Sequence, residues 1–150
     1  MKRNDARERS RGLKIKIYTD GAARGNPGPG SWGFIIEKGN GEYIGSGLLG
    51  KVTNNVAEYS AAINGLSKAL ALATEGDVIE LFSDSQLLIN QLSGRWRVKD
   101  AKLKKLKIRI DELMSELTEK GIMVELKRVS RENAGIKRTD ALCNSALDSI

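Results

Sequence analysis

Alternation of apolar and polar positions predicts that the ordered part of the chain opens with β-strands. Residues 14–20 alternate strictly, which is the period of a half-buried strand. Residues 32–36 and 43–49 are two further strand-like segments, and the Asn-Gly pair at 40–41 is typical of a tight hairpin turn between them. The segment 25–30 is rich in glycine and proline, so it is predicted to be a loop.

The rest of the chain changes to helical periodicity and then alternates strands with helices. From Ala57, apolar residues recur at spacings of 4, 3 and 4, which predicts an amphipathic helix with Asn54 or Asn55 as its N-cap. The later elements are predicted, in chain order, as a strand at 78–82, a short helix at 85–92, a longer helix around 103–117, a strand at 122–129 and a helix at 139–149.

This order of elements predicts an α/β fold. Three antiparallel strands come first, and two strands that each follow a helix come afterwards, so the latter are expected to run parallel. The expected architecture is a five-stranded mixed sheet with helices on both faces.

The amino-acid composition excludes several kinds of catalytic site. The 150 residues include no histidine, which excludes Ser-His-Asp and Cys-His nucleophiles, a histidine base and histidine-bound zinc. Cys143 is the single cysteine, so neither an intramolecular disulfide nor a cysteine zinc cluster can form, as suits a reducing compartment. Aromatic residues make up only 5%, which predicts an aliphatic core. Acid–base or metal chemistry must therefore come from carboxylates, lysine, tyrosine or water.

The net charge of +6 is unevenly distributed. Residues 1–13 carry a net charge of +3 and almost no large apolar side chains, so they are predicted to form a flexible basic arm ahead of a domain at 14–150. Residues 94–109 carry eight basic groups and one acidic group. Such a basic segment beside acidic residues is expected where phosphates are held near divalent cations, and a solvated helix face is the alternative.

Targeting and membrane signals are missing from the sequence. No apolar run approaches the roughly 20 residues that a membrane span needs. The N-terminal residues contain no apolar segment of the secretory type. We therefore expect a cytoplasmic protein without a membrane segment.

Four carboxylates occupy positions suited to a functional site. Asp20 and Asp84 lie at the carboxyl ends of predicted strands, where open α/β sheets place their sites. Glu58 and Asp140 fall in the first turns of predicted helices, where the helix dipole alone would explain an acid. The strand-end pair could likewise be turn formers, so both interpretations stay open on position alone.

The sequence around these acids resembles a known family. The segments that carry the resemblance are Tyr18-Thr19-Asp20-Gly21-Ala22 with Gly25-Asn26-Pro27-Gly28-Pro29-Gly30, Thr53-Asn54-Asn55-Val56-Ala57-Glu58, Ser83-Asp84-Ser85-Gln86 and Thr139-Asp140-Ala141-Leu142. In order and spacing they are similar to the four acidic motifs of type 1 ribonuclease H, and the resemblance extends from about Lys14 to the C-terminus. The ribonuclease H-like fold that it implies has the element order predicted above.

The resemblance implies a hydrolase that cuts the RNA strand of RNA–DNA hybrids internally and leaves 5′-phosphate and 3′-hydroxyl ends. Two Mg²⁺ ions, with Mn²⁺ as a substitute, would be held by the catalytic residues Asp20, Glu58, Asp84 and Asp140. By position, Asp20 would bridge both ions, Asp84 and Asp140 would serve the attacking water, and Glu58 would serve the leaving group. Four converging carboxylates repel one another, so they are expected to require cations.

Substrate contacts are also implied by the resemblance. Asn54 and Gln86 would read base edges and 2′-hydroxyls in the minor groove, and Thr53, assisted by Asn55, would grip a phosphate of the DNA strand. The full implied set is Arg24, Asn26, Thr53, Asn54, Asn55, Gln86, Trp96 and Lys99. The alternatives are a capping role for the Asn54-Asn55 pair, a turn role for Asn26 and a core or lid role for Trp96.

The sequence departs from many members of the family at two places. Only about seven residues separate Gly94 from the next helix, so the basic protrusion of many bacterial members is missing, and we expect the basic residues of 102–109 to substitute in part. The loop before Asp140 carries Arg131 where many members have a histidine. An arginine stays protonated near neutral pH, so it can hold a phosphate but cannot shuttle a proton. Arg131 therefore joins the catalytic set, and a surface arginine paired with Glu132 is the alternative.

Three other function classes compete with this interpretation. A non-catalytic duplex-binding module of the same fold should have lost at least one of the four acids, and none is lost. A resolvase or integrase core lacks the Asn-Pro-Gly-Pro-Gly and Asn-Asn-x-x-Glu elements. A phosphosugar or nucleotide enzyme would use the glycine loop to bind phosphate. We favour a monomeric nuclease that binds an RNA–DNA hybrid.

Overall fold

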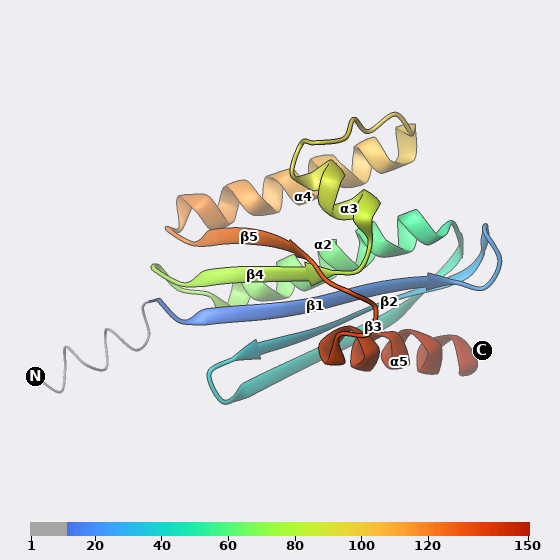
Figure 1. Ribbon diagram of the computed structural model, residues 1–150, viewed down its shortest axis with the longest axis horizontal. Helices are drawn as coiled ribbons and strands as arrows, with labels where there is room; N and C mark the ends of the chain where they lie inside the picture. Colours follow the sequence, from blue (N-terminus) through green and yellow to red (C-terminus); the bar gives the residue numbers. More distant parts are fainter. Residues whose placement is uncertain (1–11) are drawn as a thin grey trace, which may run out of the picture.

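Five strands form one mixed sheet in the order β3-β2-β1-β4-β5 (Figure 1). The computed structural model describes residues 12–150, so the predicted basic arm lies outside the described residues except for Gly12 and Leu13. The antiparallel half consists of β1 (Lys14–Ala23), β2 (Gly28–Lys38) and β3 (Gly41–Val52). The strands β4 (Val78–Ser83) and β5 (Met123–Arg128) run parallel to β1, which confirms the predicted fold class.

Helices cover both faces of this sheet. The helices α2 (Asn54–Leu72) and α4 (Ala101–Glu119) pack on one face, and α5 (Ala134–Asp148) packs on the other, against β1 and β2 (Figure 1). A short helix, α3 (Gln86–Leu92), follows β4. Among residues 12–150, no helix combines the length and the apolar character that crossing a membrane would require.

The core between the sheet and helices α2 and α4 is mainly aliphatic, as predicted. Its fully buried side chains include Ile15, Ile17, Leu66, Leu81 and Ile110, with Tyr59 as the largest exception. Burying a large aliphatic side chain stabilises the fold by roughly 1.5–3 kcal/mol relative to leaving it exposed. These side chains come from β1, α2, β4 and α4, so the core joins the sheet to both helices on this face.

The first long helix begins earlier than its apolar periodicity suggested. The hydroxyl of Thr53 accepts a hydrogen bond from the backbone N–H of Val56, so Thr53 is the N-cap and the prediction of Asn54 or Asn55 was wrong. The side chain of Asn54 is used elsewhere and accepts a hydrogen bond from the N–H of Ala23. Glu58 consequently lies beyond the first turn of α2, so the helix dipole does not account for it.

The last helix also begins earlier, at Ala134 instead of Thr139. Asn133 caps it by accepting hydrogen bonds from the N–H groups of Gly135 and Ile136. Gly135 allows a close approach to the sheet, because a Cβ atom there would lie 2.2 Å from the ring of Tyr18. The position of Asp140 is therefore beyond the first turn, and the dipole explanation fails for this acid as well.

The glycine- and proline-rich segment is a loop only in its first half. The strand β2 begins at Gly28, which pairs with Val52 of β3. A Cβ atom on Gly28 would lie 2.0 Å from the carbonyl oxygen of Arg24, and one on Gly30 would lie 2.3 Å from the side chain of Val52. These glycines thus allow tight strand packing inside a sheet. A phosphate-binding glycine loop would instead join a strand to the start of a helix.

Two strands diverge at the end of the sheet where the acids gather. The parallel pairing of β1 with β4 covers Lys14–Tyr18, whereas β1 continues to Ala23 beside β2. Asp20 therefore lies inside β1, not at its end as predicted, but it lies past the last residue paired with β4. Asp84 follows the last residue of β4 directly. This is the edge at which open α/β sheets bind ligands.

Gly21 sets the distance between β1 and α2 at this edge. A Cβ atom on Gly21 would lie 2.2 Å from the carbonyl carbon of Ala57 and 2.4 Å from the nitrogen of Glu58, and neither backbone atom can rotate away. We expect Gly21→Ala to lower the free energy of unfolding by about 3 kcal/mol or more, as measured by urea denaturation.

The matched control is Gly39→Asn in the hairpin turn. Gly39 has a φ of 57°, a Cβ atom there would have no neighbour within 4 Å, and asparagine tolerates this backbone region. This variant should stay within about 1 kcal/mol of the parent. A Gly21→Ala protein as stable as the parent would contradict the account of the β1–α2 contact.

Candidate active site

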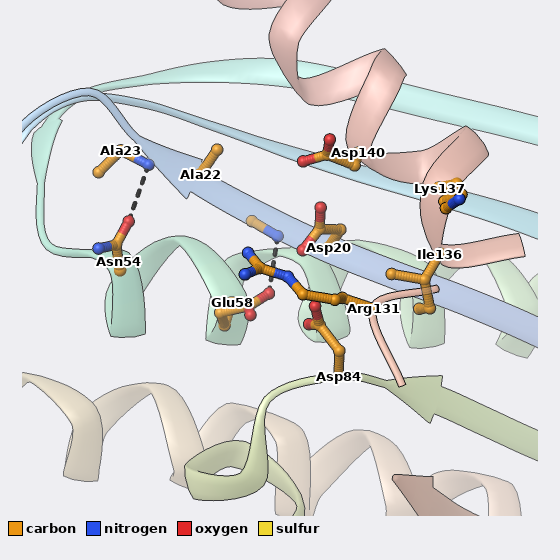
Figure 2. A pocket seen from close by; sticks show the side chains of 11 residues that line it. Asp20, Ala22, Ala23, Asn54, Glu58, Asp84, Arg131, Ile136, Lys137 and Asp140 are labelled. Atoms are coloured by element: carbon orange, nitrogen blue, oxygen red, sulfur yellow. Dashed lines mark hydrogen bonds between the residues drawn. The ribbon is translucent and has the colours of Figure 1, made fainter. Parts of the chain in front are cut away.

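Three carboxylates from separate elements meet at one open cleft. Asp20 of β1, Glu58 of α2 and Asp84 after β4 each offer an oxygen that lies within 4.8 Å of the others (Figure 2). Asp140 of α5 lines the same cleft and lies next to Asp20 (Figure 2). The cleft has a volume of about 330 Å³. The fold thus brings together the four acids that sequence motifs singled out.

Hydrogen bonds from the surrounding elements fix the orientation of these groups. The backbone N–H of Gly21 donates to Oε1 of Glu58 at 2.7 Å. The Nδ2 group of Asn144 donates to Oδ2 of Asp140 at 3.2 Å. The thiol of Cys143 donates to the backbone carbonyl of Asp20 at 3.2 Å, which ties α5 to β1 beside the cleft. The side chains of Glu58 and Asp140 are therefore oriented by their neighbours, and the strand that carries Asp20 is tied to α5.

The carboxylates disfavour one another's ionised form. Burial, followed by the charge of Asp84 and by the neighbouring Asp140 carboxyl, raises the pKa of Asp20 to about 8. Burial, and then the charges of Asp20 and Asp84, raise the pKa of Glu58 well above its usual value, although the hydrogen bond from Gly21 opposes the shift. A cluster of this kind holds negative charge at low cost only when cations neutralise it. Its all-oxygen donor set suits Mg²⁺ or Mn²⁺.

Two basic side chains line the same cleft as the acids. Arg131, from the loop between β5 and α5, reaches across the cleft toward Glu58 and Asp84 (Figure 2). Lys137 of α5 lines the same cleft. Glu132 pairs with Lys137 at 2.9 Å, and within residues 12–150 no ion pair joins it to Arg131. The alternative in which Glu132 neutralises Arg131 is therefore wrong.

The asparagines expected to contact substrate interlock at the rim of the cleft. Oδ1 of Asn54 accepts a hydrogen bond from the N–H of Ala23 at 3.1 Å (Figure 2), and Oδ1 of Asn26 accepts one from the N–H of Asn54 at 3.0 Å. The loop after β1 is thereby joined to the start of α2. Asn26 does more than form a turn, since its side chain orients this junction.

A second depression lies beside the start of α2. Its lining combines Asn26, Thr53 and Asn55 with Arg97 and Lys99, so polar groups of α2 face cations of the segment before α4. The structure thus gathers four of the expected substrate contacts at one place, next to the carboxylate cleft but distinct from it.

Asn54 lines the carboxylate cleft, and the remaining three expected contacts lie apart from both depressions. Arg24 is paired with Asp148 at 2.5 Å and also donates to the carbonyl oxygen of Asn144. Gln86 is the exposed first residue of α3. Trp96 is 44% exposed, so a core role for it is wrong. Of the residues that the structure describes, these three line neither the cleft nor the second depression.

A sequence model described as RNase H matches residues 13–145. The chain belongs to the RNase H family. It is 39% identical over 140 residues to a ribonuclease HI of Halobacterium salinarum, an alignment that covers 92% of this chain and 66% of that protein. A bifunctional protein of Mycobacterium tuberculosis is 35% identical over 144 residues, which is 91% of this chain but 36% of that protein.

Solved structures of RNase H proteins share the fold. The crystal structure of RNase H1 from Halobacterium salinarum superposes with a TM-score of 0.80 at 37% identity, covering 91% of this chain and 99% of that one. LC11-RNase H1, solved in complex with an RNA/DNA hybrid, superposes with a TM-score of 0.77 at 34% identity, covering 90% of this chain and 97% of that one. The resemblance inferred from the four motifs is thereby confirmed at the level of family and fold.

Sequence reasoning about this RNase H domain missed part of the cleft. Ile136 and Lys137 both line it, and neither was singled out, because the last helix was expected to begin only at Thr139. Lys137 lies three residues before Asp140, so a helix that begins at Ala134 places the two on one face. The Asn133 cap was the available signal for the earlier start.

The raised pKa of Asp20 predicts how the stability of the metal-free protein depends on pH. Between its usual pKa, near 3.8, and about 8, the folded protein binds more protons at this group than the unfolded chain does. Stability is then greatest at the acidic end of this window and falls as the pH rises through it. We expect Asp20→Asn to remove this loss, so that in EDTA the variant is about 1–3 kcal/mol more stable than the parent at pH 8.

Urea denaturation in EDTA at several pH values between 4 and 9 measures this difference, which should shrink toward pH 4. Glu119→Gln, at the exposed end of α4, is the control for the loss of one negative charge and should leave the pH profile unchanged. A stability difference that is constant over this pH range would contradict the assignment. Saturating Mg²⁺ should stabilise the parent more than Asp20→Asn.

Proposed function

We propose that this RNase H domain is an endonuclease that hydrolyses the RNA strand of RNA–DNA hybrids with Mg²⁺, or with Mn²⁺ in its place. The products would carry 5′-phosphate and 3′-hydroxyl ends. The observation that carries the proposal is the convergence of Asp20, Glu58 and Asp84 at the open cleft. The hybrid bound to LC11-RNase H1 supports the choice of substrate. We expect the protein to act as a monomer.

The carboxylates would hold the divalent cations. Asp20, Glu58 and Asp84 offer the closest group of oxygens, and Asp140 extends it on the side of α5. Bound divalent cations would lower the pKa of a water bound to them, and they would stabilise the negative charge on the leaving oxygen. Asp20 lies between the other acids, so its carboxylate serves both sides of the cleft. Asp84 and Asp140 would serve the attacking water, and Glu58 would serve the leaving 3′ oxygen.

The interlocked amides would recognise the RNA strand. With Oδ1 of Asn54 occupied by Ala23, its Nδ2 group remains to donate to base-edge acceptors and to the 2′-hydroxyl. Gln86, exposed at the start of α3, adds a second amide beside Asp84. Arg24 would release its ion pair with Asp148 and contact a phosphate of the substrate instead. Because the 2′-hydroxyl distinguishes RNA from DNA, these amides select the strand that is cut.

The second depression would hold a phosphate of the DNA strand. The hydroxyl oxygen of Thr53 accepts from the N–H of Val56, so the hydroxyl proton is left to donate to a phosphate oxygen. Asn55 and Lys99 line the same depression and add an amide donor and a positive charge. Trp96 presents an exposed indole to the sugar or base beside it.

One assay tests the activity, with labelled RNA–DNA hybrid, RNA–RNA, DNA–DNA and a duplex with a single ribonucleotide, each in Mg²⁺, Mn²⁺ or EDTA. We expect cleavage of the RNA strand of the hybrid with either metal and none in EDTA. Asp84→Asn should abolish cleavage and retain hybrid binding, because it removes the charge of a metal ligand and keeps its shape. Metal-dependent cleavage by Asp84→Asn at the parental rate, or no cleavage by the parent, would overturn the proposal.

Arg131 would hold the scissile or product phosphate. Its guanidinium can bind a phosphate through two parallel hydrogen bonds and stabilise developing negative charge. Since Glu132 is occupied by Lys137, the guanidinium is free of that partner. We expect Arg131→Ala to slow turnover by about ten- to hundredfold at saturating metal, and Arg131→Lys to recover only part of the loss.

A histidine at this position provides the contrast. Arg131→His should introduce a dependence of turnover on pH between about 6 and 7 that the parent lacks, because imidazole titrates there and a guanidinium does not. Single-turnover rates across that pH range make the comparison. Parental turnover in Arg131→Ala would show that the phosphate role is wrong.

A further inference from the structure

The segment 93–100 is firmly held although it has no helix or strand. The N–H groups of Arg95 and Trp96 both donate to the carbonyl oxygen of Asn90, at 2.9 and 3.0 Å. Val98 is only 9% exposed and belongs to the core cluster. Asp100 caps α4 through the N–H of Leu103. Both ends of the segment are therefore fixed.

A buried polar network supports the middle of the segment. The hydroxyl of Tyr59 donates to Oε1 of Gln91 at 2.6 Å, and Nε2 of Gln91 donates to the carbonyl oxygen of Arg97 at 3.2 Å. Tyr59 is fully buried, and Gln91 is 6% exposed. Burial raises the pKa of Tyr59 to about 12, so its hydroxyl remains a donor over the useful pH range. A chain of three groups thus links α2, α3 and the segment before α4.

The helix α2 joins this network to the carboxylate cleft. Glu58 faces the cleft, and the next residue, Tyr59, faces α3. A helix of this length is stiff, so the network sets the position of the segment relative to Glu58.

The side chains that the segment presents suit a nucleic-acid strand. Arg95, Trp96, Arg97 and Lys99 are all exposed, while the backbone that carries them is fixed. Arg97 and Lys99 face Thr53 across the second depression. Ordering such a segment only on binding would cost affinity, and a preset segment avoids that cost.

We propose that Tyr59 and Gln91 are positioning residues that hold the segment 93–100 ready for the second strand of the hybrid. The inference rests on the proposed function and deepens it. Gln91 also lines the second depression, but its Oε1 is bonded to Tyr59 and its Nε2 to Arg97, so its role is to position the segment and not to bind substrate. They act through the backbone of Arg97, whose side chain and that of Lys99 line the second depression.

Gln91→Met and Tyr59→Phe test the inference. The first keeps the size of the side chain and removes both hydrogen bonds, and the second removes one hydroxyl and preserves packing. We expect each to raise the KM for hybrid by about 3- to 10-fold and to leave kcat within about twofold of the parent. Ser60→Ala is the matched control, because it removes a buried hydroxyl of α2 that bonds only within the helix. It should leave both constants unchanged.

A double-mutant cycle separates positioning from general stability. A Trp96→Ala, Lys99→Ala background removes the two side chains of the segment that are expected to contact the hybrid, so Gln91→Met should raise KM less there than in the parent. An undiminished effect in that background, or an equal loss of kcat, would overturn the inference. So would parental KM values in both single variants.

The readouts also keep the two proposals apart. If the parent does not cut hybrid, the proposed function fails, and with it the inference that rests on it. If the parent cuts hybrid and both variants match it, only the inference fails. Urea denaturation checks that each variant is folded. If Gln91→Met does not fold, Tyr59→Phe alone tests the inference.

Discussion

The close contact between β1 and α2 at Gly21 is the constraint on which the rest of the site depends. Backbone meets backbone there without an intervening side chain, so Asp20 on the strand and Glu58 on the helix lie within reach of the same ligand. The N–H that Gly21 donates to Glu58 turns the same contact into an orienting interaction. Asp84 and Asp140 arrive from other elements, and both are arranged around this pair. The cleft is therefore a product of strand–helix packing more than of any loop.

The network around Gln91 extends the same principle away from the cleft. The helix that carries Glu58 also carries Tyr59, and the short segment before α4 takes its position from that residue through Gln91. Loops usually gain freedom with distance from regular structure. Here the segment is fixed by buried side chains below it while its charged and aromatic groups remain outside. Rigid backbone and exposed recognition groups are thus combined within eight residues.

Much of this architecture follows from the sequence, and the failures have identifiable physical causes. The period of β1 and the apolar face of α2 predict the order of elements correctly, because each is a local signal. The Asn-Gly pair at 40–41 located the hairpin but not its turn, because Lys38 pairs with Gly41 and the two turn residues are Gly39 and Asn40. The starts of α2 and α5 were missed because Thr53 and Asn133 cap helices whose first turns carry few large apolar residues. The motif spacing identified the four acids, but it gave no information on Lys137 or on the Tyr59–Gln91 bond. Those depend on which face of each helix turns toward its neighbour, which is decided by tertiary packing.

The mutual repulsion of the carboxylates affects which substitutions in the cleft would stabilise the fold. Burial strips water from the carboxyl groups of Asp20 and Glu58, and this desolvation is unfavourable for their charged forms. A neutral side chain at either position would avoid that penalty, so each acid lowers the stability of the fold when no cation is bound. Random substitution followed by selection for folding alone would therefore tend to remove them. A lineage that used this fold only as a scaffold would drift toward neutral residues in the cleft and become more stable as it did so. The acids of this cleft thus carry a cost in stability that the proposed binding of cations would offset.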